Sequence, residues 1–124
     1  AVHGSTINAY GADASGAGSH GIYAVHGSTI NAYGADASGA GANGIFASNS
    51  SQVNAEIANV SGATSYGVWS NQNSLVNAMS VNASDTGDYG FNVSFGSIIN
   101  AFNSTGTLSQ TANTIVGNSG IIFK

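Results

Sequence analysis

The chain of 124 residues lacks cysteine, proline and arginine, and its charged side chains are one lysine and five acids. Without cysteine, disulfide bonds, thiolate catalysis and cysteine-ligated zinc are excluded. A net charge of −4 cannot neutralise a phosphate backbone, so we expect no nucleic-acid partner. No apolar run is long enough for a transmembrane helix or a signal-peptide core, and no membrane insertion is expected. So few charges also exclude disorder caused by self-repulsion.

A 23-residue repeat is the strongest signal in the sequence. Residues 1–23 and 24–46 are identical at 20 of 23 positions, and residues 47–69, 70–92 and 93 onward are diverged copies. One column of the alignment is always serine, and the column two residues later is always isoleucine or valine. The next column is always asparagine (Asn8, Asn31, Asn54, Asn77 and Asn100).

The repeat predicts an all-β fold. Apolar and polar residues alternate over residues 5–9, 12–14 and 22–24, which indicates three short strands separated by Gly, Ser and Asn corners. Three short strands in one repeat are typical of one rung of a parallel β-helix, or β-solenoid. We therefore expect a single domain over residues 1–124 with about five rungs, in which each column becomes a ladder along the axis.

The columns also predict what each position does. Ile7, Ile22 and their equivalents should face inward, with alanines filling a narrow interior. The asparagine column is interpreted as a structural ladder at a corner, because asparagine tolerates a left-handed backbone and its amide can bond the rungs above and below. Gly21 and its equivalents should supply turn conformations that are closed to residues with a Cβ.

The two ends of the chain differ. The first repeat begins without a capping segment, so we expect a fragment of a longer protein. Near the other end, Gly120-Ile121 follows Gly90-Phe91 at a spacing wider than one repeat. This spacing predicts a seven-residue insertion within residues 106–113 of the last rung, 93–122. The apolar end of that rung then predicts a C-terminal cap.

The units GSTINAYGADASGAG, GIFASNSSQVNA, GVWSNQNSLVNA and GFNVSFGSIINAFNSTGTLSQTAN resemble the β-helical, pectin-lyase-like regions of phage and prophage tail fibres and tailspikes, particularly of the Gram-positive phage type. The resemblance spans the whole chain. It implies a right-handed β-helix, usually homotrimeric, that recognises host-surface polysaccharide from the virion tail, outside the cell. Similar units occur in autotransporter passengers, which leaves a bacterial cell-surface adhesin as an alternative. A self-stacking filament subunit is a further alternative, because uncapped rungs could stack end to end.

Acidic and histidine side chains are the candidates for chemistry. Asp13 and Asp36 share a column and would lie about 5 Å apart on adjacent rungs, a spacing that suits a retaining glycosidase pair or half of a calcium site. A cell-wall polysaccharide hydrolase is therefore the enzymatic alternative. Copying of a surface residue by the repeat explains the pair better, and His3 and His26 are likewise column mates. We expect no catalytic residues, no cofactor and no metal site.

Aromatic residues form outward columns. Identical subunits or sugar rings are the natural partners of such a stripe, because a contiguous apolar surface left in water is costly. The sequence thus predicts carbohydrate or subunit contact, with a homotrimer favoured, along three columns: Tyr23, Phe46 and Trp69; Tyr66 and Tyr89; and Tyr10 and Tyr33.

Overall fold

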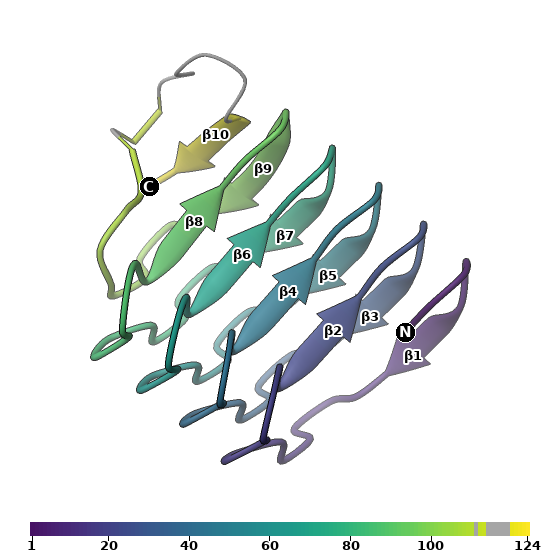
Figure 1. Cartoon of the computed structure of the whole chain (residues 1–124), viewed down its shortest axis with the longest axis horizontal. Coiled ribbons are helices and arrows are strands. Elements are labelled where there is room, and N and C mark those ends of the chain that lie inside the picture. Colours follow the sequence, from purple (N-terminus) through teal and green to yellow (C-terminus); the bar gives the residue numbers. More distant parts are fainter. Residues whose placement is uncertain (111, 114–119) are drawn as a thin grey trace.

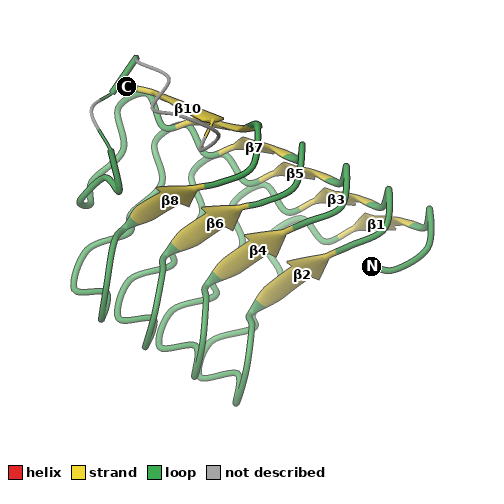
Figure 2. Cartoon of the chain, turned by 45° about the horizontal axis from the view of Figure 1, so that its top comes forward, coloured by secondary structure: helices red, strands yellow, loops and turns green. Residues whose placement is uncertain are grey.

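The chain forms a stack of similar turns in the computed structural model, which describes residues 1–110, 112–113 and 120–124 (Figure 1). The described part contains strands and no helix, and hence no helix long and apolar enough to cross a membrane. The strands lie in two parallel sheets that run along the stack (Figure 2). One has the order β1 (Thr6–Asn8), β3 (Thr29–Asn31), β5 (Gln52–Asn54), β7 (Leu75–Asn77), β9 (Ser97–Asn100) and β10 (Gly120–Phe123), and the other β2 (Ile22–Ala24), β4 (Ile45–Ala47), β6 (Val68–Ser70) and β8 (Phe91–Val93).

In both sheets, each strand residue pairs with the equivalent residue of the next repeat. Ile7 pairs with Ile30 in one sheet and Ile22 pairs with Ile45 in the other, and the members of each pair are one repeat apart. Backbone hydrogen bonds also connect equivalent corners of successive turns, as from the Gly27 N–H to the Asn49 carbonyl at 2.9 Å. The β-solenoid of 23-residue rungs that the sequence predicts is therefore confirmed.

The third strand of each rung is shorter than predicted. Residues 12–14 and their equivalents make a single bridge per turn, which runs from Asp13 through Asp36, Asn59 and Asn82 to Thr105. The neighbouring small residues leave this segment with corners on both sides, so that only one residue per turn has strand pairing. Each of the first four turns thus has two short strands and one bridging position.

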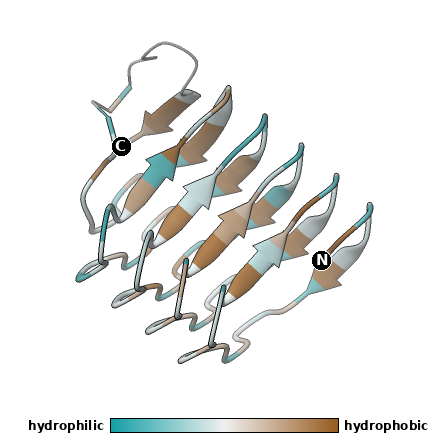
Figure 3. Cartoon of the chain, in the orientation of Figure 1, coloured by the Kyte–Doolittle hydropathy of each residue, from teal (hydrophilic) through white to brown (hydrophobic). Residues whose placement is uncertain are grey.

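The interior consists of two facing apolar columns. Ile30, Val53, Val76, Ile99 and Ile122 come from the larger sheet, and Ile22, Ile45, Val68 and Phe91 come from the smaller one; all are buried. Alanines fill the space between them, as expected for a narrow bore. Figure 3 shows a polar position between two hydrophobic ones in β8. Ile7 is the exception: it is 41% exposed, because it lies in the first turn and has a neighbouring turn on one side.

Backbone torsions correct two predictions about the corners. The ladder asparagines end their strands without a positive φ, and the left-handed positions lie at other columns, such as His26, Asn49 and Gln72. Gly21, Gly44, Gly67 and Gly90 also lack a positive φ. Glycine is required at these positions because a larger residue would clash with the next turn. A Cβ on Gly44 would lie 2.5 Å from the Val60 Cβ and 2.8 Å from the Gly67 carbonyl oxygen.

The last turn corrects the predicted insertion. Gly120 pairs with Ser97, and Ile122 pairs with Ile99, so β10 continues the larger sheet at the regular spacing of one repeat. Leu108 bridges to Phe91, which is less than one repeat before it in the chain. The turn is therefore shortened at one corner and lengthened after Leu108, and it has no net insertion. Residues 111 and 114–119, part of the predicted C-terminal cap, lie outside the described residues.

Candidate functional site

A cluster of aromatic rings covers the outer face of the smaller sheet. Tyr23, Phe46 and Trp69 are the middle residues of β2, β4 and β6, and their neighbours in each strand point into the core. Ring centroids are 5.5 Å apart between Tyr23 and Phe46, and 4.8 Å apart between Phe46 and Trp69. Phe46 and Trp69 are half-buried, and Tyr23 is 41% exposed. Period-2 alternation thus places one outward aromatic side chain on each of three successive rungs.

The second predicted column joins the first across the preceding corner. Tyr66 meets Trp69 edge-on at 5.4 Å, and Tyr89 stacks on Tyr66 at 6.4 Å. His20, which occupies the same column, stacks on Tyr23 at 5.2 Å and on Phe46 at 5.1 Å. Because the period fixes neighbours along the axis but not around a turn, the sequence did not reveal this junction. We call the combined surface the aromatic strip: His20, Tyr23, Phe46, Tyr66, Trp69 and Tyr89.

Hydrogen bonds fix the orientation of Trp69 in the strip. The Trp69 Nε1–H donates to the Ser94 hydroxyl at 3.0 Å, and that hydroxyl donates to the Asn71 Oδ1 at 2.8 Å. The Asn71 amide in turn donates to the Ser48 hydroxyl at 3.3 Å. A bonded indole nitrogen holds the ring in one rotamer, so this part of the strip is organised before any ligand arrives.

The third predicted column lies apart from the strip. Tyr10 and Tyr33 follow β1 and β3 of the larger sheet, with ring centroids 6.2 Å apart. The Tyr10 hydroxyl accepts a hydrogen bond from the Asn31 amide at 2.5 Å. Glu56 is the next residue of this column, so the tyrosines do not continue as an aromatic surface. The two tyrosines form a small exposed pair, while the strip spans more rungs.

The asparagine column is a hydrogen-bonded ladder over four of its five members. The amide of Asn54 donates to the Asn31 Oδ1 at 3.3 Å, Asn77 to Asn54 at 3.2 Å, and Asn100 to Asn77 at 3.1 Å. Asn8 makes no side-chain hydrogen bond within the described residues, because the Asn31 amide points to Tyr10 instead. The four bonded side chains are half-buried and occupy the ends of the strands.

Asp36, one of the two paired acids, belongs to a second side-chain ladder that the sequence did not reveal, and Asp13 occupies the same column but bonds to its own turn. Asp13 accepts hydrogen bonds from the Ser15 hydroxyl at 2.6 Å and from the Ser15 N–H at 3.0 Å, and these lower the pKa of the exposed Asp13 carboxyl. Asn59 donates to the Asp36 Oδ1 at 3.4 Å, and Asn82 donates to Asn59 at 3.2 Å. The sequence feature that could have revealed this ladder is the change from Asp to Asn within the bridging column, because both side chains can accept hydrogen bonds from the next turn. These bonds give the acids a structural role at the bridging position.

Histidines do not form a site with the acids. His3 and His26 stack on each other, with ring centroids 4.8 Å apart, at a separate corner of the turns. Burial lowers the pKa of His20, which favours the neutral ring within the strip. Across the described ranges, no three His, Asp or Glu side chains come together in a way that could hold a metal ion.

Chemically, the strip consists of aromatic faces, with the Ser94 hydroxyl and the Asn71 amide beside Trp69. Aromatic faces bind apolar C–H groups, while nearby amides can donate to and accept from hydroxyls. The chain matches no protein-family model, no curated protein and no solved structure. The geometry of the strip and the resemblance of the repeat units are therefore the basis for proposing a function.

Proposed function

We propose that the chain is a structural and host-recognition segment of a phage tail fibre or tailspike, and that the aromatic strip binds host-surface polysaccharide. The observation that carries the proposal is the run of aromatic side chains on consecutive rungs, with Trp69 held by Ser94. A sugar polymer presents both apolar ring faces and hydroxyl groups, and the strip offers a partner for each. The fibre assignment rests on the resemblance of the repeat units, which also implies a location in the virion tail.

The charge of the chain supports a neutral or weakly charged ligand. Arginine is absent and the single lysine is the last residue, so a strongly anionic partner would find little to bind. The acids of the bridging column accept hydrogen bonds from their own turn, as Asp13 does from Ser15. Recognition without cleavage is the function that these side chains favour.

A homotrimer is the second part of the proposal. Leu75 and Ile98 are paired neighbours on β7 and β9, and both are exposed on the outer face of the larger sheet. The preceding residues of that column, Thr29 and Gln52, are polar. This short apolar column gives identical subunits a contact surface that leaves the aromatic strip free for polysaccharide.

Retention on polysaccharide tests the strip. The full chain is run through gels that contain purified cell-wall polysaccharides of Gram-positive bacteria, and the loss of mobility is measured. Tyr23→Ser is expected to reduce the retention several-fold, because it removes one stacking face from an exposed position.

The matched control is Ile57→Ser. Ile57 is another exposed apolar side chain, it lies outside the strip, and the next turn has Ser80 at the equivalent position. This control should retain wild-type mobility in every gel. Equal retention of Tyr23→Ser and wild type, or no retention of the wild type by any polysaccharide, would contradict the proposal.

A further inference from the structure

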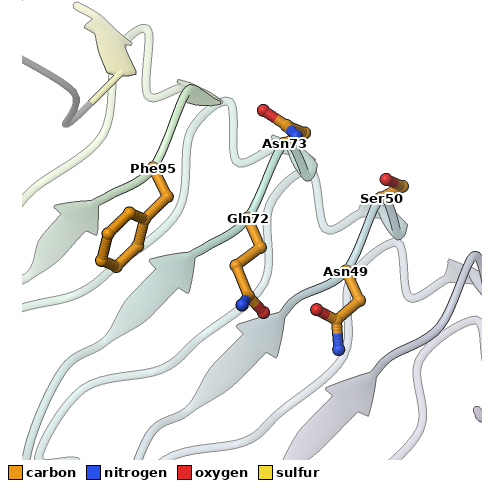
Figure 4. A pocket seen from close by; sticks show the side chains of 5 residues that line it. All are labelled: Asn49, Ser50, Gln72, Asn73 and Phe95. Carbon is orange, nitrogen blue, oxygen red and sulfur yellow. The ribbon is translucent and has the colours of Figure 1, made fainter.

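A shallow polar pocket lies at the corner that joins the two sheets. It is lined by Asn49, Ser50, Gln72, Asn73 and Phe95, and its volume is about 420 Å³. This volume falls within the usual range of small-molecule sites, roughly 300–1,000 Å³. The five residues follow β4, β6 and β8, so they come from three successive turns. In Figure 4, Asn49, Gln72 and Phe95 point to the same side of the corner, one per turn.

All five residues have a left-handed backbone, with φ between 48° for Phe95 and 61° for Ser50. Glycine and asparagine adopt this conformation at least cost, whereas a bulky side chain such as Phe95 is unfavourable there. The corner itself is held by backbone bonds between turns, including Ser50 N–H to the Gln72 carbonyl at 2.9 Å and Asn73 N–H to the Phe95 carbonyl at 3.0 Å. The fold therefore does not require the side chain of Phe95.

The amide groups of the pocket are available to a ligand. Within the described residues, the side chains of Asn49 and Asn73 make no hydrogen bond, and Gln72 uses only its Oε1, which accepts from the Ser48 hydroxyl at 2.8 Å. That bond fixes which end of the Gln72 amide is an acceptor and leaves its Nε2 donors unused. Ser48 also accepts from Asn71, whose Oδ1 is bound by Ser94, the residue that holds Trp69. One hydrogen-bond network thus orients both the pocket and the aromatic strip.

We propose that this corner pocket binds a neutral sugar unit, which makes it a second carbohydrate subsite beside the aromatic strip. The inference rests on the proposed polysaccharide binding and extends it to residues outside the strip. Amides can donate to and accept from sugar hydroxyls, and the exposed face of Phe95 suits the apolar side of a sugar ring. No lining residue carries a charge, which favours a neutral sugar over an acidic one.

Side-chain amide signals in NMR spectra of the uniformly 15N-labelled full chain test the site directly. The probes are maltohexaose, cellohexaose, laminarihexaose and chitohexaose as neutral sugars, with hexagalacturonate as the acidic one. At least one neutral probe should shift the amide signals of Asn49 and Gln72, which point to the same side of the corner as Phe95, and leave those of the ladder residues Asn54 and Asn77 in place. No shift with any neutral probe, or larger shifts with hexagalacturonate, would overturn the inference.

The indole N–H signal of Trp69 separates this inference from the proposed function. If a probe shifts Trp69 but leaves the pocket amides unchanged, the pocket is not a subsite, while binding at the strip stands. If the pocket amides shift and Trp69 does not, the pocket stands and the strip fails. If neither responds to any neutral probe, both proposals fail.

Phe95→Asn provides a second readout that a purely structural corner would not show. It should weaken binding of the neutral probe about three- to tenfold, since one aromatic face is lost. It should also raise the thermal midpoint, because asparagine tolerates the left-handed backbone better than phenylalanine. His26→Asn, in the same column but outside the pocket, is the matched control and should leave binding unchanged. Unaltered affinity in Phe95→Asn, or equal losses in both variants, would overturn the assignment.

Discussion

At the residue scale, the ladder asparagines contribute to this fold through their side chains, whereas other asparagines, such as Asn49 and Asn73, occupy left-handed corners. The ladder residues Asn31, Asn54, Asn77 and Asn100 end strands with ordinary torsions, and their amides connect one turn to the next. Each amide has a donor and an acceptor, so it can bond the turn below and the turn above at once. The repeat thus converts one residue type at one position into a continuous polar ladder.

Removing a central ladder residue should cost stability. Asn54→Ala deletes the bond that Asn54 donates to Asn31 and the bond that it accepts from Asn77. We expect the free energy of unfolding to fall by about 1–2 kcal/mol, since a net hydrogen bond is worth about 1 kcal/mol. Urea denaturation measures the change. Asn8→Ala is the control, because Asn8 is exposed and unbonded among the described side chains; an equal loss in both variants would contradict the ladder account.

His20 should make stability depend on pH. Burial lowers its pKa in the folded chain, so between about pH 6.5 and the lower folded pKa the unfolded chain binds more protons. The stability that neutral His20 contributes is therefore complete above about pH 6.5 and decreases as the pH falls toward the folded pKa. Below the folded pKa this contribution does not change further. His20→Asn, which copies Asn43 of the next turn, should lessen the fall in thermal midpoint between about pH 8 and pH 5. Identical pH profiles would show that His20 is not responsible.

At the scale of the element, the strands are too short to be stable individually. Most have three residues, and their pairing partners are the equivalent strands of adjacent turns. Stability must come from the interfaces between turns, as in other solenoids. Close approach of successive turns is therefore a requirement, and the recurring glycines at 21, 44, 67 and 90 permit it.

Gly44→Ala should be strongly destabilising for this reason. The new Cβ would lie 2.5 Å from Val60 and 2.8 Å from the Gly67 carbonyl, and the backbone oxygen cannot move aside easily. We expect a loss of about 1–3 kcal/mol, typical of overpacking. Gly18→Ala has nothing within 4 Å of its Cβ and no left-handed torsion, so it serves as the control in the same denaturation experiment. A stable Gly44→Ala variant would contradict the packing described between turns.

The sequence predicted the elements that follow from the period alone. Turn length, parallel stacking and the two inward apolar columns can be read from residues one repeat apart, as Ile30 and Val53 illustrate. The last turn was misaligned because Gly120-Ile121 resembles Gly90-Phe91 in type, although its pairing partner is Ser97. The junction of Tyr66 with Trp69 was also missed, since it depends on the path around a corner. The period determines which residues of successive turns are in contact along the axis. It does not determine which residues are in contact across a corner of one turn.

At the scale of the whole molecule, the stack presents two different outer faces. The smaller sheet carries the aromatic strip, and the larger sheet carries the asparagine ladder beside the exposed Leu75 and Ile98. Such a division allows one face to meet identical subunits while the other meets a ligand. The corner with the polar pocket lies between them.

The mass in solution tests the subunit face. We expect a species with three times the 12.2 kDa mass of one chain, and Leu75→Ser combined with Ile98→Ser should shift it toward the monomer. Leu75 is 43% exposed and Ile98 38%, so burial of the remaining surface would contribute about 0.5–1 kcal/mol for each side chain in each subunit. Sedimentation equilibrium measures the mass, with Ile57→Ser as the control. A wild-type monomer at micromolar concentration would contradict the trimer.

Polysaccharide binding at the aromatic strip is the central claim, and the fluorescence of Trp69 tests it most directly. Trp69 is the single tryptophan of the chain and lies within the strip, so its emission reports changes at this surface. Titration with purified Gram-positive cell-wall polysaccharides should shift the emission for at least one of them and reduce quenching by iodide in a saturable way. If every polysaccharide leaves both the emission and the iodide quenching of Trp69 unchanged, the strip is not a polysaccharide-binding surface.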